Sequence, residues 1–173
     1  MKIQSMARRG LAVAALAMTG PLFAQGTLAE ADKQFLERAI QGGHAEVAGG
    51  KLAVAASPSD GVKQFGQRMI ADHTRLTEEL LALARKKGLQ PPDDLSFAQK
   101  GKLAVIGSES GADFDKAYID QVAVAAHEDA IKLFQQTEAQ GRDADVKAFI
   151  AKTLPVLQEH LDMARHLQGP QPK

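Results

Sequence analysis

Cysteine and tryptophan are absent from the chain, and tyrosine occurs only once. The lack of cysteine excludes disulfides, thiolate metal ligands and a lipid-modified cysteine, so packing of apolar side chains must stabilise the fold. Aromatic residues make up only 5% of the chain, whereas strands are rich in aromatic and β-branched residues. Ala, Leu, Lys, Gln and Glu recur instead, and this composition favours helices.

An excess of charge of either sign is also lacking, because 21 Lys and Arg residues balance 21 Asp and Glu residues. Loss of residues 1–24, which hold three basic and no acidic residues, would leave 18 basic and 21 acidic residues and a formal charge of −3. Proteins that bind DNA or RNA carry a clearly basic surface. The sequence therefore predicts no nucleic-acid partner.

Long apolar runs are missing as well, and residues 11–18 form a short one near the N-terminus. This run follows three basic residues and precedes a Gly-Pro pair, which is the order found in a cleavable signal peptide. A transmembrane anchor needs roughly 20 continuous apolar residues. We therefore expect a signal peptide over residues 1–24, cleaved after Ala24 or, alternatively, after Ala29. The protein is then periplasmic or secreted without an integral membrane anchor, and the two adjacent arginines leave the general and twin-arginine routes open.

The remaining chain has the usual size of one domain. Apolar residues recur along it at spacings of three and four, which is the period of amphipathic helices. We expect a flexible N-terminus at residues 25–31, a helical domain at 32–167 and a disordered tail at 168–173. Helices are predicted over residues 28–56, 60–87, 112–139 and 144–167, with a shorter one within 95–106.

Short turns join the first long helix to the second and the third to the fourth, so each pair should form an antiparallel hairpin. Helices of about 25 residues are about 37 Å long, and the connection at 88–111 is long enough to return along that length. The sequence predicts an all-α, ferritin-like four-helix bundle with a long connection between helices 2 and 3, the alternative being an up-down-up-down order. Pro155 should kink the fourth helix, because it removes a backbone hydrogen bond.

Four ionisable residues fall on the apolar stripes of the four long helices, near or somewhat past their middles: Glu46, His73, His127 and His160. If the long connection between helices 2 and 3 returns along the bundle, all four residues lie at similar levels along the bundle axis. A carboxylate on an apolar stripe is costly unless it is paired or metal-bound, and one glutamate with three histidines can bind zinc, copper or iron. We therefore predict a buried transition-metal site, with a cluster held by hydrogen bonds alone as the alternative.

Neighbouring residues could complete such a site. Their spacing from His73 and His160 puts the thioethers of Met69 and Met163 on the same inner face, and thioether ligands would favour copper. The alternative is that both methionines only fill gaps in the apolar core. Acidic residues next to a stripe histidine could orient it or act as extra ligands, although exposed charges are the alternative. These acidic residues are Asp72, Glu128 and Glu159.

Two catalytic signatures are missing from the sequence. It contains no Glu-x-x-His, which a ferritin-type di-iron centre would use. It also contains no cysteine nucleophile and no Gly-x-Ser-x-Gly turn. Since spacing identifies no general base either, the sequence does not predict an enzyme. The two remaining histidines, His44 and His166, fall on flanking faces and are predicted to be exposed.

Four sequence blocks carry a resemblance to a known family. They are GGHAEVAGGKLA, VKQFGQRMIADHTRLTEELLALARKKG, FDKAYIDQVAVAAHEDAIKLF and VKAFIAKTLPVLQEHLDMARHL. Over residues 32–167 the chain resembles the bacterial exported family of unknown function commonly labelled "predicted outer membrane protein". The resemblance implies a ferritin-like four-helix fold and a location outside the cytoplasm, but no established activity. Many relatives have Asp where this sequence has Ala126.

Two functions are consistent with these patterns. The first is a periplasmic bundle that binds or buffers a transition metal through the Glu and His residues. The second is a non-enzymatic module for envelope stress or protein interaction, in which the polar cluster is structural and exposed helix faces or the 88–111 connection bind an envelope protein.

Overall fold

The computed structural model describes residues 28–169, and within this range the chain forms helices and no strand. The all-α prediction is therefore confirmed for these residues, and the predicted helix boundaries agree to within two residues. The predicted signal peptide and residues 170–173 lie outside the described range. The elements are α1 (Glu30–Ala56), α2 (Asp60–Lys86), α3 (Phe97–Ile106), α4 (Gly111–Tyr118), the π-helical segment η1 (Ile119–Val124), α5 (Ala125–Gln140) and α6 (Ala144–Gln168).

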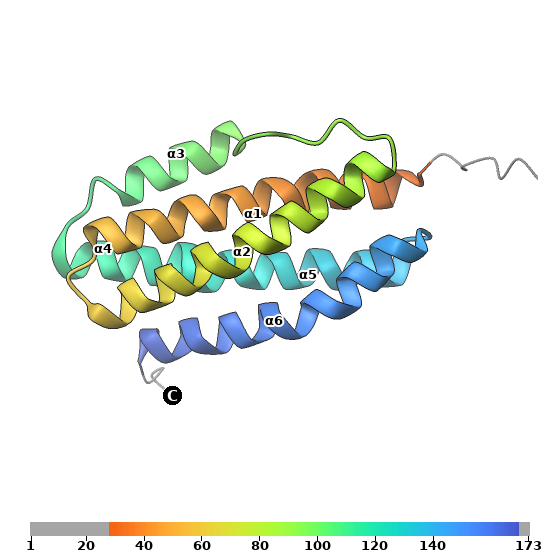
Figure 1. Ribbon diagram of the computed structural model, residues 1–173. Coiled ribbons are helices and arrows are strands. Elements are labelled where there is room, and N and C mark those ends of the chain that lie inside the picture. The colour runs from red at the N-terminus through yellow and green to blue at the C-terminus, as the bar shows by residue number, and fades with distance from the viewer. Residues whose placement is uncertain (1–27, 170–173) are drawn as a thin grey trace, which may run out of the picture.

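Two antiparallel hairpins form the body of the molecule (Figure 1). Helix α1 packs along α2 and α5 packs along α6, while α1 also contacts α5 and α2 contacts α6. The segment between α2 and α4 returns along the outside of α1 and includes α3 (Figure 1). Because of this return, α2 and α5 run in the same direction, and the middles of the four long helical segments lie at a common level.

A buried carboxylate ties the two hairpins together at one end. Asp32 of α1 accepts hydrogen bonds from the backbone N–H groups of Arg142 (2.9 Å) and Asp143 (3.1 Å) in the turn between α5 and α6. Asp143 in turn caps α6, because its carboxylate accepts a hydrogen bond from the Val146 N–H at 3.1 Å. The start of α6 is therefore positioned by α1 as well as by its own cap.

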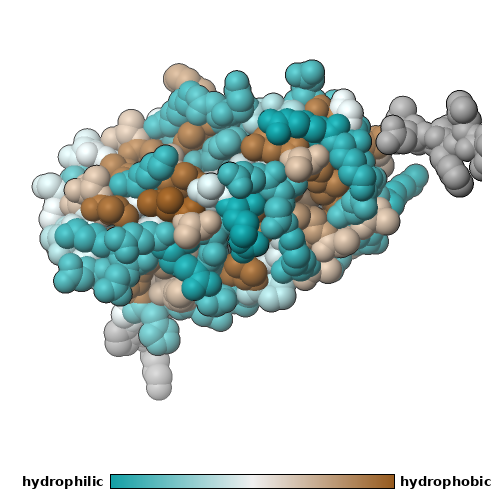
Figure 2. All heavy atoms as spheres, viewed as in Figure 1, coloured by the Kyte–Doolittle hydropathy of each residue, from teal (hydrophilic) through white to brown (hydrophobic). Residues whose placement is uncertain are grey.

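The apolar core consists of two clusters, one toward each end of the molecule. The first includes Phe65, Met69, Phe114, Val122 and Leu161, and the second includes Phe35, Ile40, Leu80, Phe134 and Ile150. Outside the core, Figure 2 shows a face covered mainly by hydrophilic residues, with apolar atoms visible between them. On each long helix, the predicted polar stripe residue lies between residues of one cluster and residues of the other, so a polar layer separates two apolar regions.

Glycines allow α1 to approach its neighbours closely beside that polar layer. A Cβ on Gly50 would lie 2.7 Å from the carbonyl oxygen of Gly66 in α2, and a Cβ on Gly66 would lie 2.8 Å from the carbonyl oxygen of Gly50. A Cβ on Gly49 would lie 2.8 Å from the Val122 side chain of η1. Larger residues at these positions would force the helices apart, so the glycines hold Glu46 close to the facing helices.

The predicted continuous helix over residues 112–139 is wrong in one respect, because six of its residues, Ile119–Val124, form the π-helical segment η1. In a π-helix each hydrogen bond spans five residues rather than four, so a turn contains one extra residue. Phe114, Tyr118 and Val122 are buried at spacings of four, and the next buried residue of that face, His127, follows at five. The extra residue keeps His127 in phase with this buried face.

Pro155 lies inside α6, which continues from Ala144 to Gln168 without interruption. Proline has no N–H to donate to the preceding turn, and a helix that contains one commonly bends. Figure 1 shows α6 changing direction part-way along its length, as expected for a proline inside a helix.

Candidate metal centre

Three histidines from three helices converge in the polar layer. His73 of α2, His127 of α5 and His160 of α6 each place one ring nitrogen so that the three atoms lie within 4.8 Å of one another. The ring centroids are separated by 5.3 to 5.5 Å. All three side chains are buried, and His160 is 0% exposed. The structure thus brings together the three histidines selected from the sequence.

The local sequence places these histidines on the inner faces of their helices. His73 follows the buried Met69 by four residues and precedes the buried Leu76 by three. His160 follows the buried Leu157 by three residues. Residues three and four apart lie on one face of an α-helix. In contrast, His127 reaches the interior through the extra residue of η1.

Most ring nitrogens of the three histidines have no hydrogen-bond partner in the described part of the chain. The buried, unpartnered atoms are Nε2 of His73, Nδ1 and Nε2 of His127, and Nδ1 of His160. A buried polar atom without a partner costs about 1–3 kcal/mol. One nitrogen from each ring lies within 4.8 Å of the others, so a single metal ion could bind one nitrogen of each histidine.

Burial also sets the charge of these groups. Burial, together with the neighbouring imidazoles, lowers the pKa of His73 well below its usual value. Burial lowers the pKa of His160 as well, against the opposing effect of Asp72. Both rings are therefore neutral near pH 7, and a neutral imidazole has a nitrogen lone pair available for a metal.

The separation of the nitrogens fits a single transition-metal ion. Zinc binds histidine nitrogen at about 2.0–2.1 Å in a tetrahedral arrangement, so ligand nitrogens lie about 3.3 Å apart. The nitrogens here lie within 4.8 Å of one another, so the rings would have to move closer together to bind one ion. Neutral imidazoles suit zinc, copper and iron. The donor set therefore fits one such ion.

Glu46 lies beside this trio and comes from the remaining long helix, α1. Its Oε1 lies 3.9 Å from Nδ1 of His127, and Oε2 is buried with no partner within residues 28–169. Burial raises the pKa of Glu46, although His127 and Lys102 oppose that shift. The group of atoms that lie within 4.8 Å of one another does not include a Glu46 oxygen, so Glu46 would have to move toward the trio to act as a fourth ligand, and metal binding would stabilise its ionised form.

Tyr118 is a buried neighbour of the site that the sequence reasoning did not select. It is 0% exposed, its hydroxyl has no partner among the described residues, and its ring packs against Phe65 and Phe114. Burial and the nearby Glu46 carboxylate raise its pKa. It is the chain's single tyrosine, but nothing in its spacing distinguishes it from a core aromatic residue.

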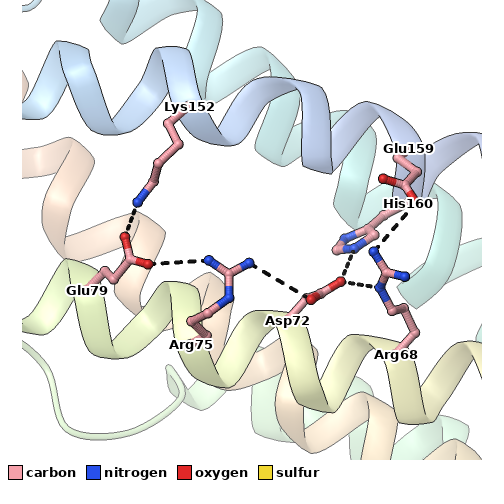
Figure 3. Close-up of polar contacts among 7 residues, drawn as sticks. All are labelled: Arg68, Asp72, Arg75, Glu79, Lys152, Glu159 and His160. Atoms are coloured by element: carbon pink, nitrogen blue, oxygen red, sulfur yellow. Dashed lines mark hydrogen bonds and ion pairs between the residues drawn. The ribbon is translucent and has the colours of Figure 1, made fainter.

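Asp72 contacts the trio from the outside. Its Oδ2 lies 3.0 Å from Nε2 of His160 (Figure 3). The same carboxylate is bound by Arg68 and faces Arg75 at 3.9 Å. Burial alone would raise the pKa of Asp72, but the hydrogen bonds from Arg68 and His160 outweigh that effect and lower it. An ionised Asp72 holds the proton of His160 on Nε2, which leaves Nδ1 to accept a metal.

The other predicted neighbours lie in different surroundings. Met69 is part of the apolar cluster next to His73, and Met163 packs at its edge. Glu128 pairs with Arg165 at 2.8 Å, and Glu159 pairs with Arg68 at 3.5 Å, both on the surface. Glu159 therefore reaches the trio only through Arg68 and Asp72.

The two histidines predicted to be exposed differ from each other. His166 is exposed, as predicted. His44 is only half-buried, and its Nε2 is inaccessible to solvent and has no partner in the described chain. The prediction for His44 is therefore wrong, because the connection that includes α3 returns along the outside of α1 and covers part of it (Figure 1).

Residues 17–167 match the family described as a domain of unknown function, DUF4142. The chain belongs to this family. The resemblance found in the sequence is thus confirmed at the level of a domain of unknown function. None of the curated proteins matches this DUF4142 chain.

This DUF4142 chain is also similar to a solved structure, that of a conserved hypothetical protein, rv2844, from Mycobacterium tuberculosis. The two share 20% sequence identity with a TM-score of 0.64, over 83% of this chain and 94% of that one. At this identity the likeness supports the helical fold alone. Among the helices described for this chain, none combines the length and apolar character needed to cross a membrane.

Proposed function

We propose that this protein is a periplasmic or secreted bundle of the ferritin-like type that binds one transition-metal ion. His73, His127 and His160 supply three nitrogen ligands, and Glu46 supplies a carboxylate oxygen. The export signal and the ferritin-like arrangement remain inferences from the sequence, from its basic-apolar N-terminus and from its crossover connection. The metal is zinc, copper or iron, the ions that imidazole ligands suit.

One observation carries the proposal: three buried histidines from three helices each place one ring nitrogen within 4.8 Å of the others, and each ring has a nitrogen without a hydrogen-bond partner among the described residues. A cluster held by hydrogen bonds would pair these nitrogens with each other or with Glu46. Instead, the one contact between Glu46 and a histidine nitrogen is 3.9 Å long, beyond hydrogen-bond range. Asp72 adds the carboxylate–histidine contact that commonly orients a metal-binding imidazole.

Metal content and titration test the proposal. Protein purified without chelator should contain close to one zinc, copper or iron per chain by elemental analysis, and calorimetric titration of the metal-free protein should show one site. His160→Ala should abolish binding at that site. His166→Ala is the matched control, because it removes an exposed histidine from the same helix, and it should bind as the wild type does. Equal binding by both variants would contradict the assignment.

An interaction module is the second candidate function, and α3 supplies its supporting observation. Phe97 and Val105 are 92% and 65% exposed on this outer helix, where large apolar side chains suit a protein contact. Under this proposal the polar layer is structural, so added metal would leave the melting temperature unchanged. Replacing Phe97 and Val105 by Ser would then remove binding to an envelope partner without affecting the fold.

A further inference from the structure

A cavity of ≈ 300 Å³ lies beside the polar layer, and residues of α1, α2, α3, η1, α5 and α6 line it. On α2 its wall runs from His73 to Leu80, and on α5 it runs from Ala126 to Phe134. Seven residues of an α-helix span about 10 Å. The cavity therefore begins at the polar layer and extends along the bundle into the second apolar cluster, which includes Leu80 and Phe134.

The cavity reaches the candidate metal centre from one side. His127 and His160 are 1% and 0% exposed and do not line it, and Asp72 covers the His160 ring on the outer side (Figure 3). Glu46 and His73, in contrast, belong to the cavity wall. Oε2 of Glu46 is sealed from solvent, whereas Oε1, which lies 3.9 Å from Nδ1 of His127, is not. The side of the trio that Glu46 faces is therefore the side open to the cavity.

Three histidine ligands leave a metal ion with free coordination positions. Catalytic zinc sites commonly have three protein ligands and hold water or substrate in the fourth position, and zinc can also take a fifth ligand. Glu46 would have to move toward the trio to occupy one position. A ligand from the cavity can bind beside Glu46 or in its place, because both approach the trio from the same side.

The cavity wall also indicates the chemistry of such a ligand. Away from the polar layer the wall is largely apolar, with Leu80, Phe134 and Phe149 among its members. Charges of both signs line the exposed part, where Arg38 and Asp129 are examples, so the wall does not favour an ionic ligand of either sign. Small-molecule sites are typically mostly apolar clefts of at least about 300 Å³. A neutral molecule with an apolar body fits this cavity.

We propose that the metal ion held by His73, His127 and His160 binds one exogenous ligand through this cavity. The ligand is a neutral organic molecule with a metal-coordinating donor atom at one end and an apolar body that packs against Phe134 and Phe149. This inference rests on the proposed function, because the metal ion supplies the attachment point for the donor atom. The metal centre is then an open site that binds a small molecule, rather than a closed structural site.

Cobalt(II) provides the reporter for the experiment, because it takes the same ligands as zinc and its visible absorption changes when a ligand joins its coordination sphere. In protein loaded with cobalt, 4-phenylimidazole should change the spectrum in one saturating phase. It should bind at least about tenfold more tightly than imidazole, which lacks the apolar ring. 3-Phenylpyrrole has the same shape but no free nitrogen lone pair, so it should leave the spectrum unchanged. An unchanged spectrum with 4-phenylimidazole, or equal affinities for the two imidazoles, would overturn the proposal.

Glycine substitutions test the route of the ligand. Gly42 lines the cavity, and a Cβ there would have no atom within 4 Å, so Gly42→Leu should occupy the cavity without disturbing the helix. Gly101→Leu is the matched control, because Gly101 is also a helical glycine with open space but does not line the cavity. Both variants should bind cobalt as the wild type does. Gly42→Leu should lose at least about tenfold in affinity for 4-phenylimidazole, whereas Gly101→Leu should keep it. Equal affinities for the two variants would contradict the route.

Metal content distinguishes failure of this inference from failure of the proposed function. If the wild type binds cobalt at the trio but 4-phenylimidazole does not alter its spectrum, the proposed function stands and the open site is wrong. If the wild type binds no cobalt, zinc, copper or iron, both are wrong. If calorimetry shows that 4-phenylimidazole binds the metal-free protein equally well, the metal does not hold the ligand, and the inference is wrong.

Discussion

The two nitrogens of His160 face two polar regions that differ sharply. On the outer side, Nε2 joins a network at the α2–α6 surface in which every charged group has a partner (Figure 3). Its members are Arg68, Asp72, Arg75, Glu79, Lys152 and Glu159. On the inner side, Nδ1 belongs to the histidine trio, where nitrogens lack partners within residues 28–169. Helices α2 and α6 thus provide hydrogen-bond or ion-pair partners for their polar side chains at the surface, but not for the histidine nitrogens in the interior.

The two regions also differ in what they contribute to stability. Exposed ion pairs of the outer network contribute about 0–1 kcal/mol each, because water screens them. Each unpartnered buried nitrogen of the inner trio costs about 1–3 kcal/mol. The trio therefore destabilises the metal-free fold, whereas a metal ion would turn that cost into a favourable interaction. Substitutions confined to one region should separate the two contributions.

The largest effect is expected from removing a histidine of the trio that has no partner at either nitrogen. Metal at about a thousandfold excess over its dissociation constant should stabilise the wild-type protein by about 4 kcal/mol. His127→Leu should lose this stabilisation completely, measured by chemical denaturation with and without zinc. Without metal the variant should be at least as stable as wild type, since both His127 nitrogens lack partners in the described structure.

His166→Leu provides the control for this experiment, because it removes an exposed histidine outside the trio. It should keep the full stabilisation by zinc. A His127→Leu variant that retains the zinc-induced shift would show that the trio does not hold the metal.

The next largest effect concerns the link between the two regions. Asp72→Ala removes the acceptor for the Nε2 proton of His160, and loss of such a partner typically weakens metal binding 10- to 100-fold. Asp72→Asn should restore part of the affinity, because its amide oxygen can still accept that hydrogen bond. Competition with a chromogenic chelator measures these affinities. Equal affinities for Asp72→Ala and wild type would show that Asp72 does not orient His160.

Acid should destabilise the metal-free protein through the inner trio. The pKa values of His73 and His160 are lowered by burial, so below about pH 6.5 the unfolded chain binds more protons than the folded chain. Stability should be full above that pH and fall as the pH drops, by at most about 1.4 kcal/mol per pH unit for each histidine. His73→Leu should flatten this dependence in urea denaturation between pH 7.5 and 5.5.

Glu46 acts in the opposite direction, because burial raises its pKa. Its protonation favours the folded state at low pH, and that contribution is lost as the pH rises through its folded pKa. Glu46→Gln should therefore make the loss of stability in acid steeper than in wild type. A shallower loss in this variant would contradict the assigned burial of Glu46.

The smallest effect is expected in the outer network away from His160. Glu79→Ala removes the ion-pair partner of Lys152 and one of the two carboxylates near Arg75, all of them at least partly exposed, and should change stability by less than about 1 kcal/mol. Metal affinity should remain unchanged. A loss of metal affinity comparable to that of Asp72→Ala would show that the two polar regions act as one.

Much of this fold was predictable because its signals are local. Apolar residues at spacings of three and four, with turn residues between the runs, predict where each helix begins and ends. The inward positions of His73 and His160 follow from regular α-helical spacing. His127 was selected on the same basis, but the structure places it through η1. Tyr118 and Val122 pack against Gly49 of α1 beside this π-helical turn, and periodicity within one helix does not record such a contact.

The contacts of the acidic residues were the least predictable part. Asp72, Glu128 and Glu159 all adjoin a stripe histidine in sequence, yet only Asp72 contacts one. Which of these carboxylates contacts a histidine depends on the angle between α2 and α6 and on which arginine lies opposite each carboxylate. The cavity of ≈ 300 Å³, which Glu46 and His73 help to line, was likewise invisible in the sequence, because it arises where several helical segments leave space between them rather than from any motif.

Anomalous X-ray diffraction from crystals of the zinc-loaded protein, measured on both sides of the zinc absorption edge, would show whether the three buried histidines bind one metal ion. We predict one peak per chain about 2.0–2.1 Å from a ring nitrogen of each of His73, His127 and His160. A peak at an exposed residue such as His166, or no peak among the three buried histidines, would show that the trio is not the metal site.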